Sequence, residues 1–62
     1  MTRIFKSFKD IQIGGYFQYG TIVYKKDIEE INGRYMYFGE MFNNRDPKMR
    51  VYLKPQEEIE EI

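Results

Sequence analysis

The side chains with the clearest potential for chemistry are tyrosines interleaved with lysines and arginines. The chain has 62 residues, and six Tyr with five Phe bring its aromatic content to 18%. Aromatic residues, Met and Arg are enriched at protein interfaces, where they act as anchors. The same mixture of rings and cations lets a single-strand nucleic-acid binder stack bases and follow phosphates. The residues that we expect to contact a partner are Tyr16, Tyr19, Lys25, Lys26, Arg34, Tyr35, Tyr37, Arg50 and Tyr52.

The usual catalytic side chains are missing from the composition. With no Cys and no His, the chain has no thiol nucleophile, no Ser-His pair and no imidazole base, and structural zinc lacks its common ligands. The carboxylates at predicted turns and loops are Asp10, Asp27, Glu40 and Asp46. The acidic cluster around Asp27 lacks the spacing of a calcium loop. We therefore predict a protein that is not an enzyme, with no catalytic residue, metal ligand or cofactor.

The charge balance argues against a dedicated duplex-DNA binder. Ten Lys and Arg residues face ten Asp and Glu residues, so the formal net charge is zero. Proteins that bind duplex DNA normally carry a positive excess that neutralises phosphates. The positive charges do concentrate in residues 45–54, where four cations accompany one acid. No secretory or membrane-spanning apolar run is present, so we expect a cytoplasmic protein without a membrane partner.

Two hairpins are predicted to position these side chains. In the first, a corner at Tyr19-Gly20 would place Phe17 opposite Ile22, with Phe17, Ile22 and Tyr24 on the core face. In the second, Asn32-Gly33 favours a type I′ turn that sets Glu30 beside Tyr35 and Ile28 beside Tyr37. We also expect a bulge near Asp27, where the strand must re-aim its side chains.

The remaining segments suggest a single domain over residues 1–62. Residues 1–7 form a basic, aromatic arm, and Ile11-Gln12-Ile13 is predicted to be a short strand before two glycines. Strict alternation predicts an amphipathic strand at residues 49–54, with Met49, Val51 and Leu53 inward. Residues 56–62 are expected to be a frayed acidic tail. The fold class predicted is all-β: a small antiparallel sheet or SH3-like barrel of four to five short strands.

The run Phe8-Lys9-Asp10-Ile11-Gln12-Ile13-Gly14-Gly15-Tyr16-Phe17, followed by Tyr19-Gly20 and Tyr24-Lys25-Lys26, carries a resemblance. It is similar to a pattern in small uncharacterised bacteriophage proteins, Phe-x-Asp-hydrophobic-x-hydrophobic-Gly-x-x-Phe, then a Gly turn, then Tyr-x-Lys. It also loosely resembles the opening of SH3-like barrels of the translation-factor type. Such patterns often place Asp after the first Gly, where this chain has Gly15, so a role of that carboxylate does not carry over. The resemblance implies a viral origin and activity in a host cytoplasm.

Two functions remain open at this point. The first is a small protein-binding module, phage-encoded, that acts on a host or phage protein through its Tyr-rich surface. Self-association belongs to the same class, because a 62-residue sheet gains burial from a second copy. The alternative is a single-stranded nucleic-acid-binding protein that uses Tyr with Lys and Arg.

Overall fold

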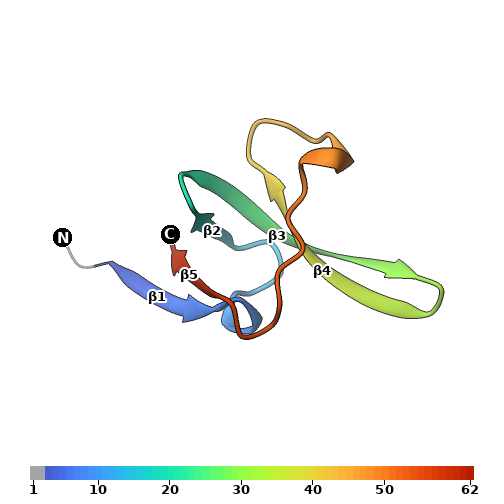
Figure 1. The fold of residues 1–62 in the computed structure, drawn as a ribbon, viewed down its shortest axis with the longest axis horizontal. Coiled ribbons are helices and arrows are strands. Elements are labelled where there is room, and N and C mark those ends of the chain that lie inside the picture. Colours follow the sequence, from blue (N-terminus) through green and yellow to red (C-terminus); the bar gives the residue numbers. More distant parts are fainter. Residues whose placement is uncertain (1–2) are drawn as a thin grey trace.

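The computed structural model describes residues 3–62 and contains one antiparallel sheet of five strands in the order β1-β5-β2-β3-β4 (Figure 1). The strands are β1 (Ile4–Ser7), β2 (Tyr16–Tyr19), β3 (Ile22–Ile31), β4 (Arg34–Met41) and β5 (Glu58–Glu61). Two short 3₁₀ helices, η1 (Phe8–Asp10) and η2 (Pro47–Met49), lie in the connections. The sheet is open, so the all-β antiparallel prediction is confirmed in its sheet form and the barrel does not close. Within residues 3–62, no helix has the length and apolar character needed to cross a bilayer.

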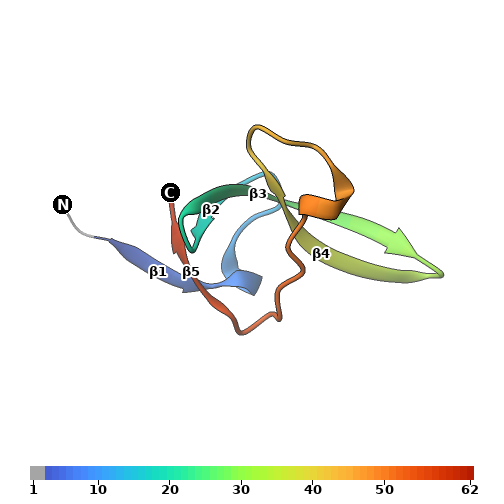
Figure 2. The ribbon, with the colours of Figure 1, turned by 45° about the horizontal axis from the view of Figure 1, so that its top comes forward.

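The long strand β3 joins the two halves of the sheet. Its first residues, Ile22 to Lys25, pair with β2, and residues Tyr24 to Ile31 pair with β4. The β3–β4 hairpin therefore extends away from β1, β2 and β5, and this projecting arm is visible in both ribbon views (Figures 1 and 2). The register of β3 on β4 is continuous through Asp27, so the predicted bulge is wrong.

The turns of the two hairpins differ in how well local sequence predicted them. Asn32 and Gly33 have φ values of 52° and 78°, as a type I′ turn requires, and the pairings Glu30–Tyr35 and Ile28–Tyr37 are confirmed. In the first hairpin, Gly20 and Thr21 form the turn, so Phe17 lies opposite Tyr24 instead of Ile22. The shift is two residues along β3. It therefore leaves Phe17 and Tyr24 on the same face, as predicted.

Both ends of the described chain are strands. Residues 4–7 of the expected basic arm form β1, while Met1 and Thr2 lie outside the described residues. The expectation of a frayed acidic tail is wrong, because Glu58–Glu61 forms β5 and pairs with both β1 and β2. Ile59 supplies the reason, since its side chain is buried in the core. Lys6 also pairs with Glu61 at 2.9 Å, which offsets part of the acidic charge of β5.

Residues 49–54 do not form the predicted strand. Val51 alone makes a bridge, to Gly39 of β4, and Met49 is exposed because it ends η2. The predicted inward direction of the side chains is confirmed for Val51 and Leu53, which pack against the core. The predicted strand at Ile11-Gln12-Ile13 is also absent, and a turn there leaves Ile11 buried and Ile13 exposed.

The core lies on one face of the sheet and is built mainly from aromatic rings. Its buried members are Phe8, Ile11, Phe17, Tyr24 and Ile59. The Phe17 ring meets Phe8 edge-on at 5.4 Å and stacks on Tyr24 at 5.7 Å. Gly39 is required at its position, because a Cβ there would approach Phe17 Cζ to 2.6 Å. Phe38 is buried on the opposite face, where Arg50 lies 4.3 Å from its ring centre.

Candidate functional site

The main concave feature of the described residues is a cleft between the β3–β4 hairpin and the chain that leads to β5. It has a volume of about 580 Å³. Its aromatic and aliphatic lining comprises Phe8, Ile11, Ile13, Tyr35, Met36, Tyr37, Tyr52, Leu53 and Pro55, and its charged lining comprises Lys9, Lys26 and Lys54. An apolar cleft with a few convergent polar groups is the usual form of a binding site. We take this cleft as the candidate functional site.

The cleft exists because the returning chain is bridged to β4 by backbone hydrogen bonds at Gly39 and then leaves the strand. Gly39 and Val51 exchange backbone hydrogen bonds of 2.8 and 3.0 Å, which hold the returning chain against the outer edge of β4. Further along, residues 52–55 turn toward η1, where Lys9 N–H donates to the carbonyl of Pro55 at 2.9 Å. The two chain segments therefore diverge and leave a wedge along Tyr35 to Tyr37.

Lys26 is the unusual residue of the lining, since its side chain is only 3% exposed. Its ammonium donates hydrogen bonds of 2.7 Å to the carbonyl oxygens of both Phe8 and Ile11. It also lies 4.6 Å from the ring centre of Phe8 and 5.1 Å from that of Tyr37. Lys26 thus ties the segment around η1 to β3 and places a positive charge beside the Tyr37 ring.

The setting of Lys26 changes its titration. Burial disfavours the charged ammonium and lowers the pKa of Lys26 below its ordinary value, while the negative charge of Asp10 raises it and partly opposes this effect. No salt bridge shorter than 4.0 Å engages Lys26 among residues 3–62, so carbonyl dipoles and ring faces are its close partners.

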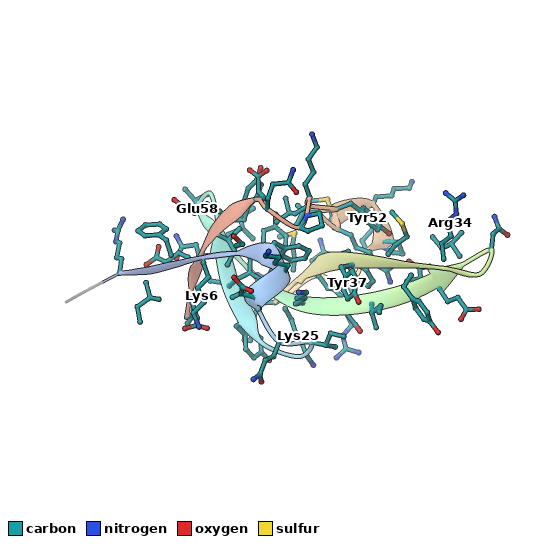
Figure 3. The ribbon with its side chains drawn as sticks, turned by 90° about the horizontal axis from the view of Figure 1, so that it is seen from below. Lys6, Lys25, Arg34, Tyr37, Tyr52 and Glu58 are labelled. Atoms are coloured by element: carbon teal, nitrogen blue, oxygen red, sulfur yellow. The ribbon has the colours of Figure 1, made fainter. Side chains whose placement is uncertain are left out.

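The tyrosine walls of the cleft are open to solvent. Tyr35 and Tyr37 are 64% and 44% exposed, and Tyr52 across the cleft is also exposed. In Figure 3, Tyr37 and Tyr52 lie in the middle of the molecule, between Arg34 near the hairpin tip and Lys6 with Glu58 at the other end. Rings in such positions offer a large contact area to a partner.

Arg50 is committed to contacts within the chain. Its guanidinium pairs with Glu29 at 3.0 Å and with Glu40 at 3.8 Å, and it packs over the Phe38 ring. The Tyr52 hydroxyl donates to the same Glu29 carboxylate at 3.4 Å. The basic run at residues 45–54 is therefore partly neutralised at its centre by carboxylates of β3 and β4.

The predicted contact residues divide into those that line the cleft and those that do not. Lys26, Tyr35, Tyr37 and Tyr52 come together in the lining. The predicted residues that lie elsewhere are Tyr16, Tyr19, Lys25, Arg34 and Arg50. Tyr16 packs edge-on against Phe42 at 6.2 Å, near a smaller hollow of about 300 Å³ that includes Phe42 in its lining. The predicted surface is thus not continuous.

Several lining residues carried no functional signal in the sequence. Leu53 was predicted to point inward, Lys9 stood as a single charge, and Lys54 belonged to the basic run at residues 45–54, far from Lys9 in the chain. They meet because η1 and residues 52–55 are hydrogen bonded to each other. The useful local signal was the Tyr35-Met36-Tyr37 run, one residue after the Asn32-Gly33 turn.

No cluster of three or more His, Cys, Asp or Glu side chains in residues 3–62 is arranged to hold a metal ion. Comparison of the chain with protein-family models, with curated proteins and with solved structures finds no match.

Proposed function

We propose that this domain is a non-enzymatic protein-binding module whose partner occupies the cleft. The observation that carries the proposal is the exposure of Tyr35 and Tyr37 above an apolar floor, with the Lys26 ammonium at its base. Exposed apolar surface costs stability in water unless a partner covers it, and tyrosine is among the residues that dominate binding energy at interfaces. The partner gains apolar burial from the rings and an electrostatic contact from the lysines.

Three features favour a protein over a single-stranded nucleic acid. Arg50 is engaged by two carboxylates, and Lys26 by two backbone carbonyls, so neither presents a free cation to a phosphate. Tyr16 and Tyr19 lie outside the cleft, so the tyrosines do not form one continuous track for successive bases. The net charge is zero.

The resemblance of residues 8–26 to bacteriophage proteins supports a viral origin, and with it a bacterial host protein as the partner. This step is an analogy of pattern, because the matching residues include core members such as Phe8 and Phe17. A second copy of the chain remains a further partner of the same class.

The proposal is tested by capture from a nuclease-treated bacterial lysate with the tagged full chain. A discrete protein should be retained by the wild type and lost by the double variant Tyr35→Ala, Tyr37→Ala. The matched control is Tyr16→Ala, Tyr19→Ala, which also removes two exposed rings but from outside the cleft. We expect this control to capture the same protein.

Two results would contradict the proposal. One is equal capture by both double variants, with far-UV circular dichroism showing that both are folded. The other is retention that disappears when nuclease is added and falls steeply as salt rises, which is the behaviour of a phosphate-binding surface.

A further inference from the structure

The outer edge of β4 is open where it borders the cleft. β4 is the last strand in the sheet order, and in residues 3–62 the bridges made outside the paired strands are Gly39 with Val51 and Met41 with Asn44. The strand continues from Gly39 back to Arg34 with β3 on one side only. An unpaired strand edge is a template for another extended chain.

The backbone groups that face this edge can be assigned from the Gly39 bridge. Gly39 directs its N–H and C=O outward, to the C=O and N–H of Val51. In an antiparallel strand, alternate residues direct their backbone groups to the same side. Tyr37 and Tyr35 therefore also direct N–H and C=O outward. The intervening residues Met36 and Phe38 direct theirs to β3, where they face Glu29 and Asp27.

The outward N–H and C=O groups of Tyr35 and Tyr37 face the cleft, because Tyr35, Met36 and Tyr37 form one of its walls. The opposite wall is the chain at residues 52–55, which has already left β4. An extended segment laid along Tyr35 to Tyr37 would thus meet backbone hydrogen-bonding groups on one side and apolar side chains on the other.

The charge of the lining specifies the chemistry of the occupant. The cleft is bordered by Lys9, Lys26 and Lys54 and by no carboxylate. None of these lysines takes part in a salt bridge within residues 3–62. Lys9 and Lys54 are exposed, while the Lys26 ammonium is engaged by two backbone carbonyls and adds its charge from beneath. An occupant with carboxylates complements this lining. A second copy of the chain that paired through β4 would bring its own Lys9, Lys26 and Lys54 to the cleft and be repelled.

We propose that an acidic, extended segment of the partner protein adds as a strand to the outer edge of β4 inside the cleft. The inference deepens the proposed function and rests on it. Strand addition takes its affinity from main-chain hydrogen bonds and its specificity from alternate side chains. Here the backbone groups of Tyr35 and Tyr37 supply the main-chain hydrogen bonds, and the lysines supply the specificity for acidic side chains.

The test is a titration of the full chain, labelled with ¹⁵N, by the peptide acetyl-Glu-Val-Glu-Val-Glu-Val-Glu-amide, followed by amide NMR shifts. The Tyr35 and Tyr37 amides should move most, because their N–H groups gain acceptors. The same peptide with Lys in place of Glu should cause no saturable shift. Absence of shifts at these amides with the acidic peptide at millimolar concentration would overturn the proposal.

Backbone methylation of the peptide distinguishes strand addition from simple charge attraction. One peptide carries N-methyl groups at its odd positions and a second at its even positions. A strand presents alternate N–H groups to β4, so one peptide should lose binding and the other should retain it. Equal binding by both peptides would contradict pairing with β4.

The role of the lysine lining is tested by Lys54→Glu with Lys48→Glu as the matched control. Both lysines are exposed, but only Lys54 borders the cleft. At low salt we expect Lys54→Glu to weaken the acidic peptide by about fivefold or more and Lys48→Glu to change it by less than about twofold. Equal effects of both variants, or stronger binding of oligothymidylate than of the peptide, would contradict an acidic protein segment as occupant.

The two proposals can fail separately. If lysate capture is lost in the Tyr35→Ala, Tyr37→Ala variant but neither amide responds to peptide, the protein-binding function stands and strand addition is wrong. If capture does not depend on the cleft while the peptide binds there, the proposed function is wrong. Dimer formation through β4, detected by sedimentation, would also contradict the acidic occupant.

Discussion

Lys26 shows how one side chain can serve both the fold and the site. Its ammonium satisfies the carbonyls of Phe8 and Ile11, which are buried residues of a segment that has no strand partner of its own. A buried carbonyl without a donor costs about 1–3 kcal/mol. The same ammonium lies over the Tyr37 ring, so the charge that holds the segment in place also makes the electrostatic potential of the cleft more positive.

We predict that Lys26→Met lowers the free energy of unfolding by about 1–3 kcal/mol at pH 7, because the substitution removes both hydrogen bonds and leaves the Ile11 carbonyl without a donor, while the Phe8 carbonyl keeps the Ile11 N–H. Urea denaturation followed by circular dichroism measures the change. An unchanged unfolding midpoint would show that the Ile11 carbonyl finds another donor and that Lys26 does not hold the segment.

The lowered pKa of Lys26 gives the stability a specific pH dependence. Above the folded-state pKa and up to the ordinary value of 10.5, the unfolded chain binds more protons than the folded chain, so stability rises with pH through this window. Below the folded-state pKa, both states are protonated and this contribution is constant. The difference between wild type and Lys26→Met should show the rise, since tyrosine titration is common to both proteins. A flat difference up to pH 10.5 would contradict the lowered pKa.

At the scale of elements, β5 has a structural role that its sequence did not predict. It separates β1 from β2 in the sheet and carries Ile59 into the core. Its acidic composition suggested a solvated tail, because local charge was visible in the sequence while pairing with the distant strands β1 and β2 was not. Non-local pairing is decided by burial, which composition alone does not reveal.

The prediction for β5 compares two isoleucines of the same segment. Ile59 is 2% exposed and Ile62 is 65% exposed. Ile59→Ala should cost about 2–5 kcal/mol, enough to unfold a domain whose core supplies about 3–5 kcal/mol, whereas Ile62→Ala should stay within about 0.5 kcal/mol of wild type. Thermal melting followed by circular dichroism measures both. A folded, wild-type-like Ile59→Ala would show that β5 does not hold the sheet together.

The hairpins show which parts of the fold local sequence does determine. Asn32-Gly33 fixed both the turn and the register of β3 on β4, because two consecutive positive φ angles are accessible to few other residue pairs. Gly20 indicated a turn but not its position, and the pairing of Phe17 moved from Ile22 to Tyr24. Turn chemistry that demands a specific geometry is predictive, whereas a single glycine leaves several registers open.

Some lining residues of the candidate site could be predicted from the sequence, and others could not. Tyr35, Tyr37 and Tyr52 could be named from residue type, and the cleft contains all three. That Lys9 and Lys54 line the same cleft could not be predicted, because it depends on the contact between η1 and residues 52–55. The ion pairs of Arg50 with Glu29 and Glu40 could not be predicted, because they depend on how residues 49–54 return along the β3–β4 hairpin.

At the scale of the whole molecule, the fold separates a packed end from a binding end. The described chain extends 42 × 23 × 16 Å, and the core rings lie on η1, β2 and β3, beside Ile59 of β5. The hairpin projects from this end and carries Tyr35 and Tyr37 on the open edge of β4 (Figure 1). From Tyr35 to Phe38, this projecting strand edge is apolar and carries no charge, so another extended chain can pair with it. We propose that a partner protein supplies that chain.

The most direct test places a photo-crosslinking amino acid, p-benzoylphenylalanine, at Tyr35 in the cleft and, separately, at Tyr19 outside it, in protein expressed in bacterial cells. The account predicts that irradiation links a discrete cellular protein at Tyr35 and not at Tyr19. Crosslinking to a protein only from Tyr19, or crosslinking from Tyr35 only to nucleic acid, would contradict the assignment of the cleft as a protein-binding site.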